Sequence, residues 1–154
     1  MTLPGFEAIL SHRVAFFLAT EAGAPLAARM LAACAQGRTG IDIHPTVKIG
    51  SHFFIDHGTG VVIGATATVG SYVTLYHGVT LGTLRIPRLA SGELERSSRR
   101  HPTIEDHVTI YCNATILGGD TVVGHHAVIG SGAVIMASVA PHSLIRIKVE
   151  GELS

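Results

Sequence analysis

The 154-residue sequence has no tryptophan and only two cysteines, and its 11 Lys and Arg balance its 11 Asp and Glu. Zero net charge provides no basic surface for a nucleic acid. Because Cys34 and Cys112 cannot form a disulfide framework, we expect a reduced, cytoplasmic protein. The longest apolar run near the N-terminus, residues 14–19, is far shorter than the roughly 20 residues that cross a bilayer. Residues 1–7 lack the basic start of a signal peptide, so we expect no membrane partner.

Charged side chains are also scarce. They make up 14% of the chain, whereas apolar residues make up 47%. This balance excludes a disordered chain, and the length suits a single domain. So few charges leave apolar surface that other subunits would cover, so we expect an oligomer.

The first part of the chain is predicted to be helical. Residues 2–37 are rich in helix formers, with Pro4 and Pro25 placed where a helix can begin. Gly23 interrupts the pattern, and Gly37 is expected to close the second helix. We therefore expect a short helical hairpin.

From residue 41 onward, aliphatic residues recur every six positions. A period of six fits neither an α-helix nor a simple strand and is typical of a parallel β-helix, in which three units make one triangular coil. The aliphatic side chains should fill the prism, and the glycines that follow them should adopt corner angles that a Cβ would resist. The aliphatic positions are Ile43, Ile49, Ile55, Ile63, Val69, Leu75, Leu81, Ile104, Ile110, Ile116, Val123, Ile129 and Ile135. The glycines are Gly50, Gly64, Gly70, Gly82, Gly124 and Gly130.

Two interruptions break the six-residue period. The spacing from Ile55 to Ile63 is eight, which predicts two extra residues near Gly58–Gly60. Residues 83–100 form an inserted loop, and such loops commonly build the binding face of a repeat protein. The loop carries Arg85, Arg88, Arg96, Arg99 and Arg100. We expect a helical segment over 1–40, a β-helix domain over 41–142 with this loop, and a tail over 143–154.

Several motifs lie within these repeats. They are Gly-Ile-Asp-Ile-His-Pro at 40–45, Lys-Ile-Gly at 48–50, Asp-His-Gly-Thr-Gly at 56–60, Val-Thr-Leu-Gly at 79–82 and Arg-His-Pro at 100–102. With these motifs in this order, the chain resembles the serine acetyltransferases, a family of hexapeptide-repeat acyltransferases, from about Phe6 to His142. The resemblance implies a mainly β, left-handed parallel β-helix that transfers acetyl from acetyl-CoA to L-serine, for cysteine biosynthesis.

The sequence departs from this family at both ends. The helical part is short, about 40 residues, where the family carries a large domain that supplies a substrate-binding carboxylate and joins two trimers. The family's Gly-x-Pro-Ala element and its terminal isoleucine, which docks into cysteine synthase, are absent after His142. We therefore expect a homotrimer, not a hexamer, and do not expect docking to cysteine synthase.

The resemblance also assigns roles to site residues. His57 corresponds to the general base, and Asp42 to the carboxylate that orients it, as in a catalytic triad. Since Asp42 and His57 are 15 positions apart and a coil has about 18 residues, they could lie on adjacent rungs. His101 is implied as a second active-site histidine. Arg100 and Asp56 are implied to bind the carboxylate and the ammonium of a zwitterionic substrate.

Coenzyme A is expected between the prisms of neighbouring subunits. The resemblance implies that the main chain of Cys112, Asn113, Ser131 and Gly132 contacts its pantetheine arm, although these are also ordinary corner positions. The loop arginines could meet the coenzyme phosphates or form a solvated loop. No base is assigned to Cys112, so we expect direct attack on the thioester and no covalent enzyme intermediate.

Three alternatives remain open at this stage. Some hexapeptide prisms are zinc carbonic anhydrases, and His52, His57 and His77 could form such a site between two subunits. The acceptor could be another small hydroxyl compound, such as homoserine or a sugar. The chain could also be an inactive paralogue. The Asp-His and Arg-His-Pro motifs favour the transferase, for which no metal is expected.

Overall fold

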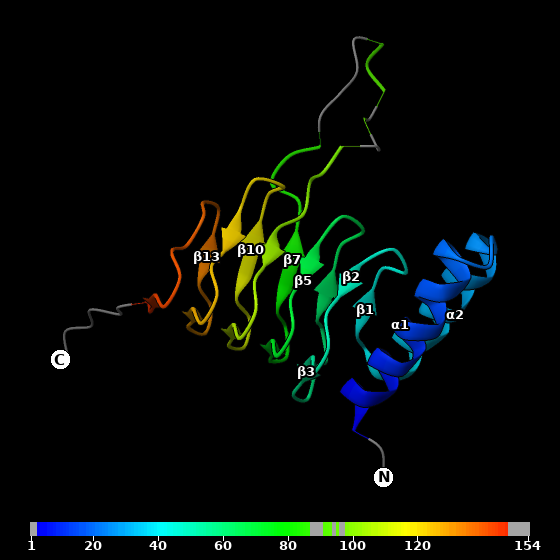
Figure 1. Ribbon diagram of the computed structural model, residues 1–154, viewed down its shortest axis with the longest axis horizontal. Coiled ribbons are helices and arrows are strands. Elements are labelled where there is room, and N and C mark those ends of the chain that lie inside the picture. Colours follow the sequence, from blue (N-terminus) through cyan, green and yellow to red (C-terminus); the bar gives the residue numbers. More distant parts are fainter. Residues whose placement is uncertain (1–2, 87–90, 94, 96–97, 148–154) are drawn as a thin grey trace, which may run out of the picture.

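The computed structural model describes residues 3–86, 91–93, 95 and 98–147. Two helices, α1 (Pro4–Thr20) and α2 (Pro25–Thr39), precede a stack of very short strands (Figure 1). In the described residues the strands are β1 (Asp42–Ile43), β2 (Lys48–Ile49), β3 (Phe54–Ile55), β4 (Val62–Ile63), β5 (Thr68–Val69), β6 (Thr74–Leu75), β7 (Thr80–Gly82), β8 (Thr103–Ile104), β9 (Thr109–Ile110), β10 (Thr115–Leu117), β11 (Val122–Val123), β12 (Val128–Ile129), β13 (Val134–Ile135) and β14 (Leu144–Ile145).

The strands form three faces of a prism. Face 1 is the sheet β1-β4-β7-β10-β13, face 2 is β2-β5-β8-β11 and face 3 is β3-β6-β9-β12-β14. All strand pairs are parallel, and successive strands along the chain belong to successive faces, so each coil visits all three. The expected left-handed parallel β-helix is confirmed, and so is the helical hairpin in front of it.

The chain turns at three corners, which we name by the faces they join. The 1–2 corner comprises residues 44–47, 64–67, 100–102, 118–121 and 136–138. The 2–3 corner comprises residues 50–53, 70–73, 105–108, 124–127 and 140–143. The 3–1 corner comprises residues 56–61, 76–79, 111–114 and 130–133. Side chains that share a corner lie above one another, whereas those on different corners are separated by the width of the prism.

Strand register locates both interruptions. Asp42 pairs with Val62, twenty positions later, whereas Val62 pairs with Thr80, eighteen positions later, so the first coil holds the two extra residues. The inserted segment leaves the stack after β7 and returns before β8 at the 1–2 corner (Figure 1). Arg88 and Arg96 lie outside the described residues, as do residues 148–154. At the C-terminal end, β14 pairs with β12, so sheet structure continues past residue 142 into the expected tail.

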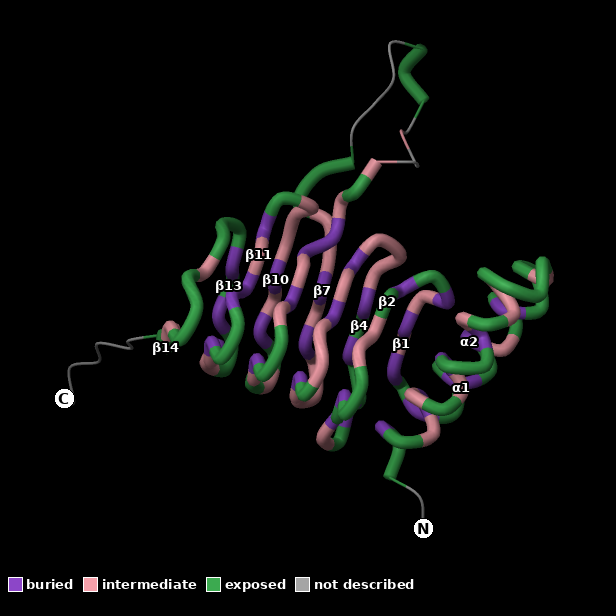
Figure 2. The backbone as a smooth tube through the Cα atoms, in the orientation of Figure 1, coloured by how far each residue is buried: buried purple, intermediate pink, exposed green. Residues whose placement is uncertain are grey.

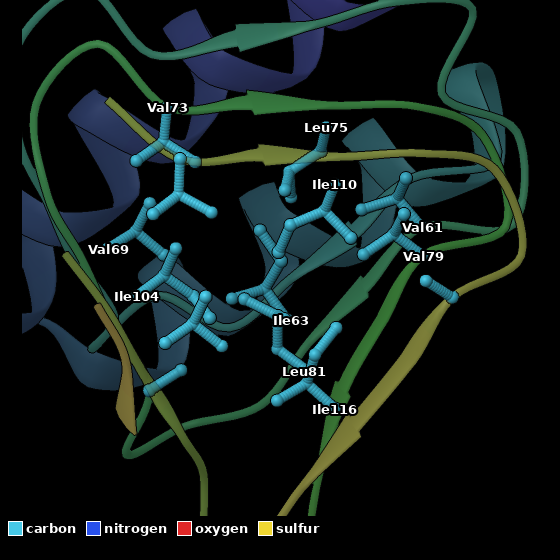
Figure 3. Packing of buried hydrophobic residues seen from close by; sticks show 14 of the residues in the cluster. Val61, Ile63, Val69, Val73, Leu75, Val79, Leu81, Ile104, Ile110 and Ile116 are labelled. Atoms are coloured by element: carbon cyan, nitrogen blue, oxygen red, sulfur yellow. The ribbon is translucent and has the colours of Figure 1, made fainter. Parts of the chain in front are cut away.

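The predicted aliphatic positions fill the prism. All thirteen are buried except Ile49, which is partly buried against the same cluster. Ile63, Leu81 and Ile116 stack on face 1, and buried residues follow the interior of every coil (Figures 2 and 3). Since each coil buries its apolar residues against the coils beside it, the core is continuous along the solenoid.

The glycines that follow the aliphatics have a different role from the one expected. None of the six has a positive φ, so the expectation of special corner angles was wrong. Instead, the next coil leaves no room for a side chain: a Cβ on Gly50 would lie 2.6 Å from the carbonyl carbon of Gly70, and one on Gly124 would lie 2.5 Å from the nitrogen of Pro141. Left-handed angles occur instead at His52, His57, Tyr72, His107, Asn113, His126 and His142.

Aromatic rings at the 2–3 corner stack into a column that we call the histidine–tyrosine ladder. It consists of His52, Tyr72, His107, His126 and His142. Successive ring centroids are 4.3 to 5.0 Å apart, and their planes differ by 3 to 7°. The ladder follows from the fold, because each left-handed corner residue lies one strand spacing above the last.

The helical hairpin covers the N-terminal end of the solenoid. α1 packs against β1 and β3, and the Arg13 guanidinium donates hydrogen bonds to the carbonyl oxygens of Ile49 and Gly50. α2 continues through Gly37 to Thr39, so the expected end at Gly37 was wrong. Gly40, with φ of 71°, caps it instead. None of the described helices is long and apolar enough to span a membrane.

Protonation of His12, on α1 of the hairpin, should make the stability of the folded protein depend on pH. Its side chain is 3% exposed on α1, and burial, with the neighbouring charge of Arg13, lowers its pKa to about 4. The folded state therefore binds this proton more weakly than the unfolded state. Stability should fall by about 3 kcal/mol as the pH drops from about 6.5 to about 4. Chemical denaturation of wild type and His12→Leu at pH 7 and pH 4.5 measures this; an equal pH dependence in both proteins would contradict it.

Candidate active site

At the 1–2 corner, His101 is held in a defined orientation. It is 8% exposed, and its Nδ1 lies 2.8 Å from Thr66 Oγ1 and 3.2 Å from the Thr66 backbone nitrogen, which donates to it. Thr66 Oγ1 also accepts hydrogen bonds from the backbone nitrogens of Arg100 and His101. Because Nδ1 is an acceptor, the proton of the neutral ring is on Nε2.

Several effects keep His101 neutral. Burial lowers its pKa first, and the charges of Arg100 and His44 lower it further. A neutral imidazole with its proton on Nε2 can donate a hydrogen bond to an oxygen that gains negative charge. His101 is therefore suited to binding a substrate or an oxyanion.

His44 lies at the same corner, two coils below His101. Its Nδ1 is 2.8 Å from Thr46 Oγ1 and accepts a hydrogen bond from the Thr46 backbone nitrogen. Burial, Arg29 and Arg100 lower its pKa, and the Asp42 carboxylate opposes them. His44 was not among the residues predicted for the site. The signal that could have indicated it is its position two residues after Asp42, since Asp42 begins β1 and His44 directly follows that strand.

The 3–1 corner contains the other predicted residues. Asp56 and the exposed His57 follow β3, and the ring of His57 meets that of His77 edge-on, with centroids 6.1 Å apart. Two coils above, Cys112 Sγ donates to Ser131 Oγ over 3.2 Å. Backbone hydrogen bonds from Asn113 to His77 and from Gly132 to Cys112 align these coils in register. The structure therefore brings Cys112, Asn113, Ser131 and Gly132 to the same corner as His57.

The predicted pair of Asp42 and His57 is not formed within one chain. The two residues lie in the same coil, not on adjacent rungs, because Asp42 begins the twenty-residue coil and pairs with Val62. No hydrogen bond or ion pair joins their side chains, both of which are described. His57 and His101 are also on different corners. One chain therefore carries two halves of the predicted site.

The histidines of the zinc hypothesis are likewise divided. His52 stacks on Tyr72 at the 2–3 corner, whereas His57 and His77 lie at the 3–1 corner. Among the described residues, no three His, Cys, Asp or Glu side chains are arranged to hold a metal ion. The donor set of that hypothesis is not assembled in the chain.

Known proteins resemble this chain in sequence. No protein-family model matches it. Over 105 residues, 68% of the chain, it is 51% identical to the plasmid serine acetyltransferase of Synechococcus elongatus and 50% identical to the serine acetyltransferase of Mycobacterium tuberculosis. These segments are 33% and 42% of the relatives' lengths, so the chain spans less than half of either protein.

Solved structures resemble it in fold. Serine acetyltransferase 1 of Entamoeba histolytica, in complex with L-cysteine, has a TM-score of 0.86 and 40% identity over 95% of this chain and 53% of its own. The serine acetyltransferase of Neisseria gonorrhoeae in complex with serine has a TM-score of 0.82 and 34% identity, over 97% of this chain and 57% of its own. In sequence over about two thirds of its length, and in fold over nearly all of it, the chain is a homologue of the serine acetyltransferases.

Proposed function

We propose that this chain is an acetyl-CoA-dependent O-acetyltransferase that acetylates the hydroxyl of L-serine, giving O-acetylserine for cysteine biosynthesis. The observation that carries the proposal is the neutral His101, fixed by Thr66 with its proton on Nε2, beside Arg100. The homologous Neisseria gonorrhoeae structure, solved with serine, supports the choice of acceptor. Two free cysteines suit a reducing cytoplasm.

The proposed reaction is a direct attack. His57 accepts the hydroxyl proton of serine as the oxygen attacks the thioester carbonyl carbon. The tetrahedral oxyanion accepts a hydrogen bond from Nε2–H of His101. When the carbon–sulfur bond breaks, the His57 imidazolium returns the proton to the coenzyme A sulfur. Arg100 binds the substrate carboxylate through its guanidinium fork, and Asp56 binds the ammonium.

The proposed site needs two chains. Because His57 and His101 lie on different corners, we place the 3–1 corner of one chain against the 1–2 corner of the next in a homotrimer. Face 1 then lies toward the three-fold axis, and the 2–3 corner points outward. We place Asp42 as the residue that orients His57 in this assembly, since its carboxylate accepts no hydrogen bond from any residue that the structure describes.

The residues of the 3–1 corner suit the proposed donor. Asn113 and Gly132 are exposed and have positive φ, so their main chain is accessible at the corner. We propose that this main chain, with that of Cys112 and Ser131, binds the pantetheine arm of acetyl-CoA. The arm would then run along the solenoid from the proposed base, His57.

A direct assay tests the proposed function. The protein is incubated with acetyl-CoA and L-serine, L-homoserine or glucose, and released coenzyme A is detected as a thiol. We expect the highest kcat/KM with L-serine. Turnover with another acceptor only would contradict the serine assignment, and no turnover with any acceptor would contradict the transferase.

Substitution of Gly64 tests the role of the His101 orientation. A Cβ at Gly64 would lie 2.1 Å from Cδ2 and Nε2 of His101, so Gly64→Ala should displace the ring from Thr66. We expect kcat to fall by about a hundredfold, the scale for a displacement of about 1 Å. Gly37→Ala is the control, because no atom lies within 4 Å of a Cβ there. Equal activity of the two variants would contradict the assignment.

A further inference from the structure

The inserted segment and the coils behind it enclose a pocket at the 1–2 corner. Its volume is about 290 Å³. The segment contributes residues where it leaves β7 and where it returns to β8, and the coils contribute the turns after β10 and β13. The lining residues are Leu84, Arg85, Arg99, Arg100, Gly118, Gly119, Asp120, Thr121 and Met136.

Close backbone contact forms one wall of this pocket. Thr115 pairs with Val134, nineteen positions later, and the extra residue lies in β10, directly before the turn at residues 118–121. A Cβ on Gly119 would lie 2.4 Å from the Arg99 carbonyl oxygen and 3.0 Å from the Arg100 nitrogen. The returning leg of the inserted segment therefore lies directly on this turn. As a result, Arg99 and Arg100 are placed at the pocket by the solenoid itself.

The residues that line the pocket carry an excess of positive charge. Three arginine residues line it, against one acidic residue, Asp120. The whole chain has equal numbers of basic and acidic residues, so this local excess comes from position and not from composition. Guanidinium groups remain charged at all relevant pH values, and several around one concavity raise the local concentration of anions. Their forked donors match phosphate oxygens in pairs.

The pocket lies on the proposed subunit boundary. Arg100 lines it and also belongs to the proposed serine site, so the two sites are continuous at the 1–2 corner. In the proposed trimer this corner faces the 3–1 corner of the next chain, where the pantetheine arm would bind. Leu84 and Met136 add apolar surface beside the arginines.

We propose that this pocket binds the phosphates of the acyl donor, that is, the 3′-phosphorylated ADP portion of coenzyme A, through Arg85 and Arg99. This proposal rests on the proposed function, since it concerns the same donor. The proposal gives the inserted segment a function, which serine binding by Arg100 does not provide. Arg100 is left to the serine carboxylate.

Donors with and without phosphates test the proposal. Arg85→Ala/Arg99→Ala is compared with wild type using acetyl-CoA and acetyl-pantetheine, which lacks the nucleotide. We expect KM for acetyl-CoA to rise at least about tenfold in the variant, the scale of one lost charge-assisted hydrogen bond. The kcat/KM for acetyl-pantetheine should stay unchanged. Arg38→Ala is the control, because Arg38 pairs with Glu7 on the helical hairpin, and it should leave both donors unaffected.

Direct binding separates failure of this proposal from failure of the transferase. Calorimetry with adenosine 3′,5′-bisphosphate needs no turnover, and we expect affinity in wild type and in Arg38→Ala that is lost in Arg85→Ala/Arg99→Ala. Equal binding to all three proteins, or an equal loss of kcat/KM with both donors, would overturn the pocket assignment. If no donor supports turnover but the bisphosphate binds only when both arginines are present, the phosphate site stands and the transferase fails.

Discussion

His57→Ala should reduce turnover of acetyl-CoA and L-serine at least about a hundredfold, the usual contribution of a general base. Without the imidazole, water must accept the hydroxyl proton, and no positioned acid returns it to the leaving sulfur. The folded structure should tolerate the change, because His57 is exposed at a corner and its ring makes one edge-on contact, with His77. KM for L-serine should change less than kcat.

A second histidine provides a matched control for this variant. His52 is also exposed at a corner, and its φ of 54° is close to the 57° of His57, so alanine imposes a similar backbone strain at both positions. His52 lies at the 2–3 corner, away from both halves of the proposed site. His52→Ala should therefore keep wild-type turnover. Activity of His57→Ala within a few-fold of His52→Ala would contradict the role of His57 as base.

Mixed trimers should recover activity from two inactive variants. His57→Ala chains supply an intact His101, and His101→Ala chains supply an intact His57. Because the two residues lie on different corners, a boundary between unlike chains can contain both. In a random three-chain ring, about one boundary in four has this arrangement, so co-expressed variants should show about a quarter of wild-type activity.

Differently tagged chains allow the mixed trimers to be isolated and assayed. Each variant alone should stay inactive, and so should His57→Ala mixed with the double variant His57→Ala/His101→Ala, which has no boundary with both histidines. A mixture no more active than its components would show that the two histidines do not meet between chains.

The sequence was sufficient to predict the architecture, because the interior of a β-helix requires a buried apolar residue about every six positions. That period is visible directly in the sequence. The aliphatic series from Ile43 to Ile135 fixes which side chains face inward, and the broken spacing before Ile63 locates the enlarged coil. Backbone angles were less predictable. Gly64 and its equivalents are required by the approach of the next coil, a contact that no local pattern contains.

The site was predictable only as a set of residues. The motifs predict roles for His57, His101 and Arg100, but residue spacing does not determine which corner each of these residues occupies. Asp42 and His57 lie in one coil, and His101 packs above Thr66, a placement that no local pattern contains. The effect of Asp42 on His44 was missed although the two residues are two positions apart, because burial of His44 at the 1–2 corner has the larger influence on its pKa.

The histidine–tyrosine ladder makes protonation of one of its own rings, His126, less favourable. Desolvation by the stacked rings, and then the charges of His107, His142 and His125, lower the pKa of His126. An imidazolium at this position would lie against the other rings of the ladder, so stacking along this corner holds His126 in its neutral form more strongly than an isolated histidine.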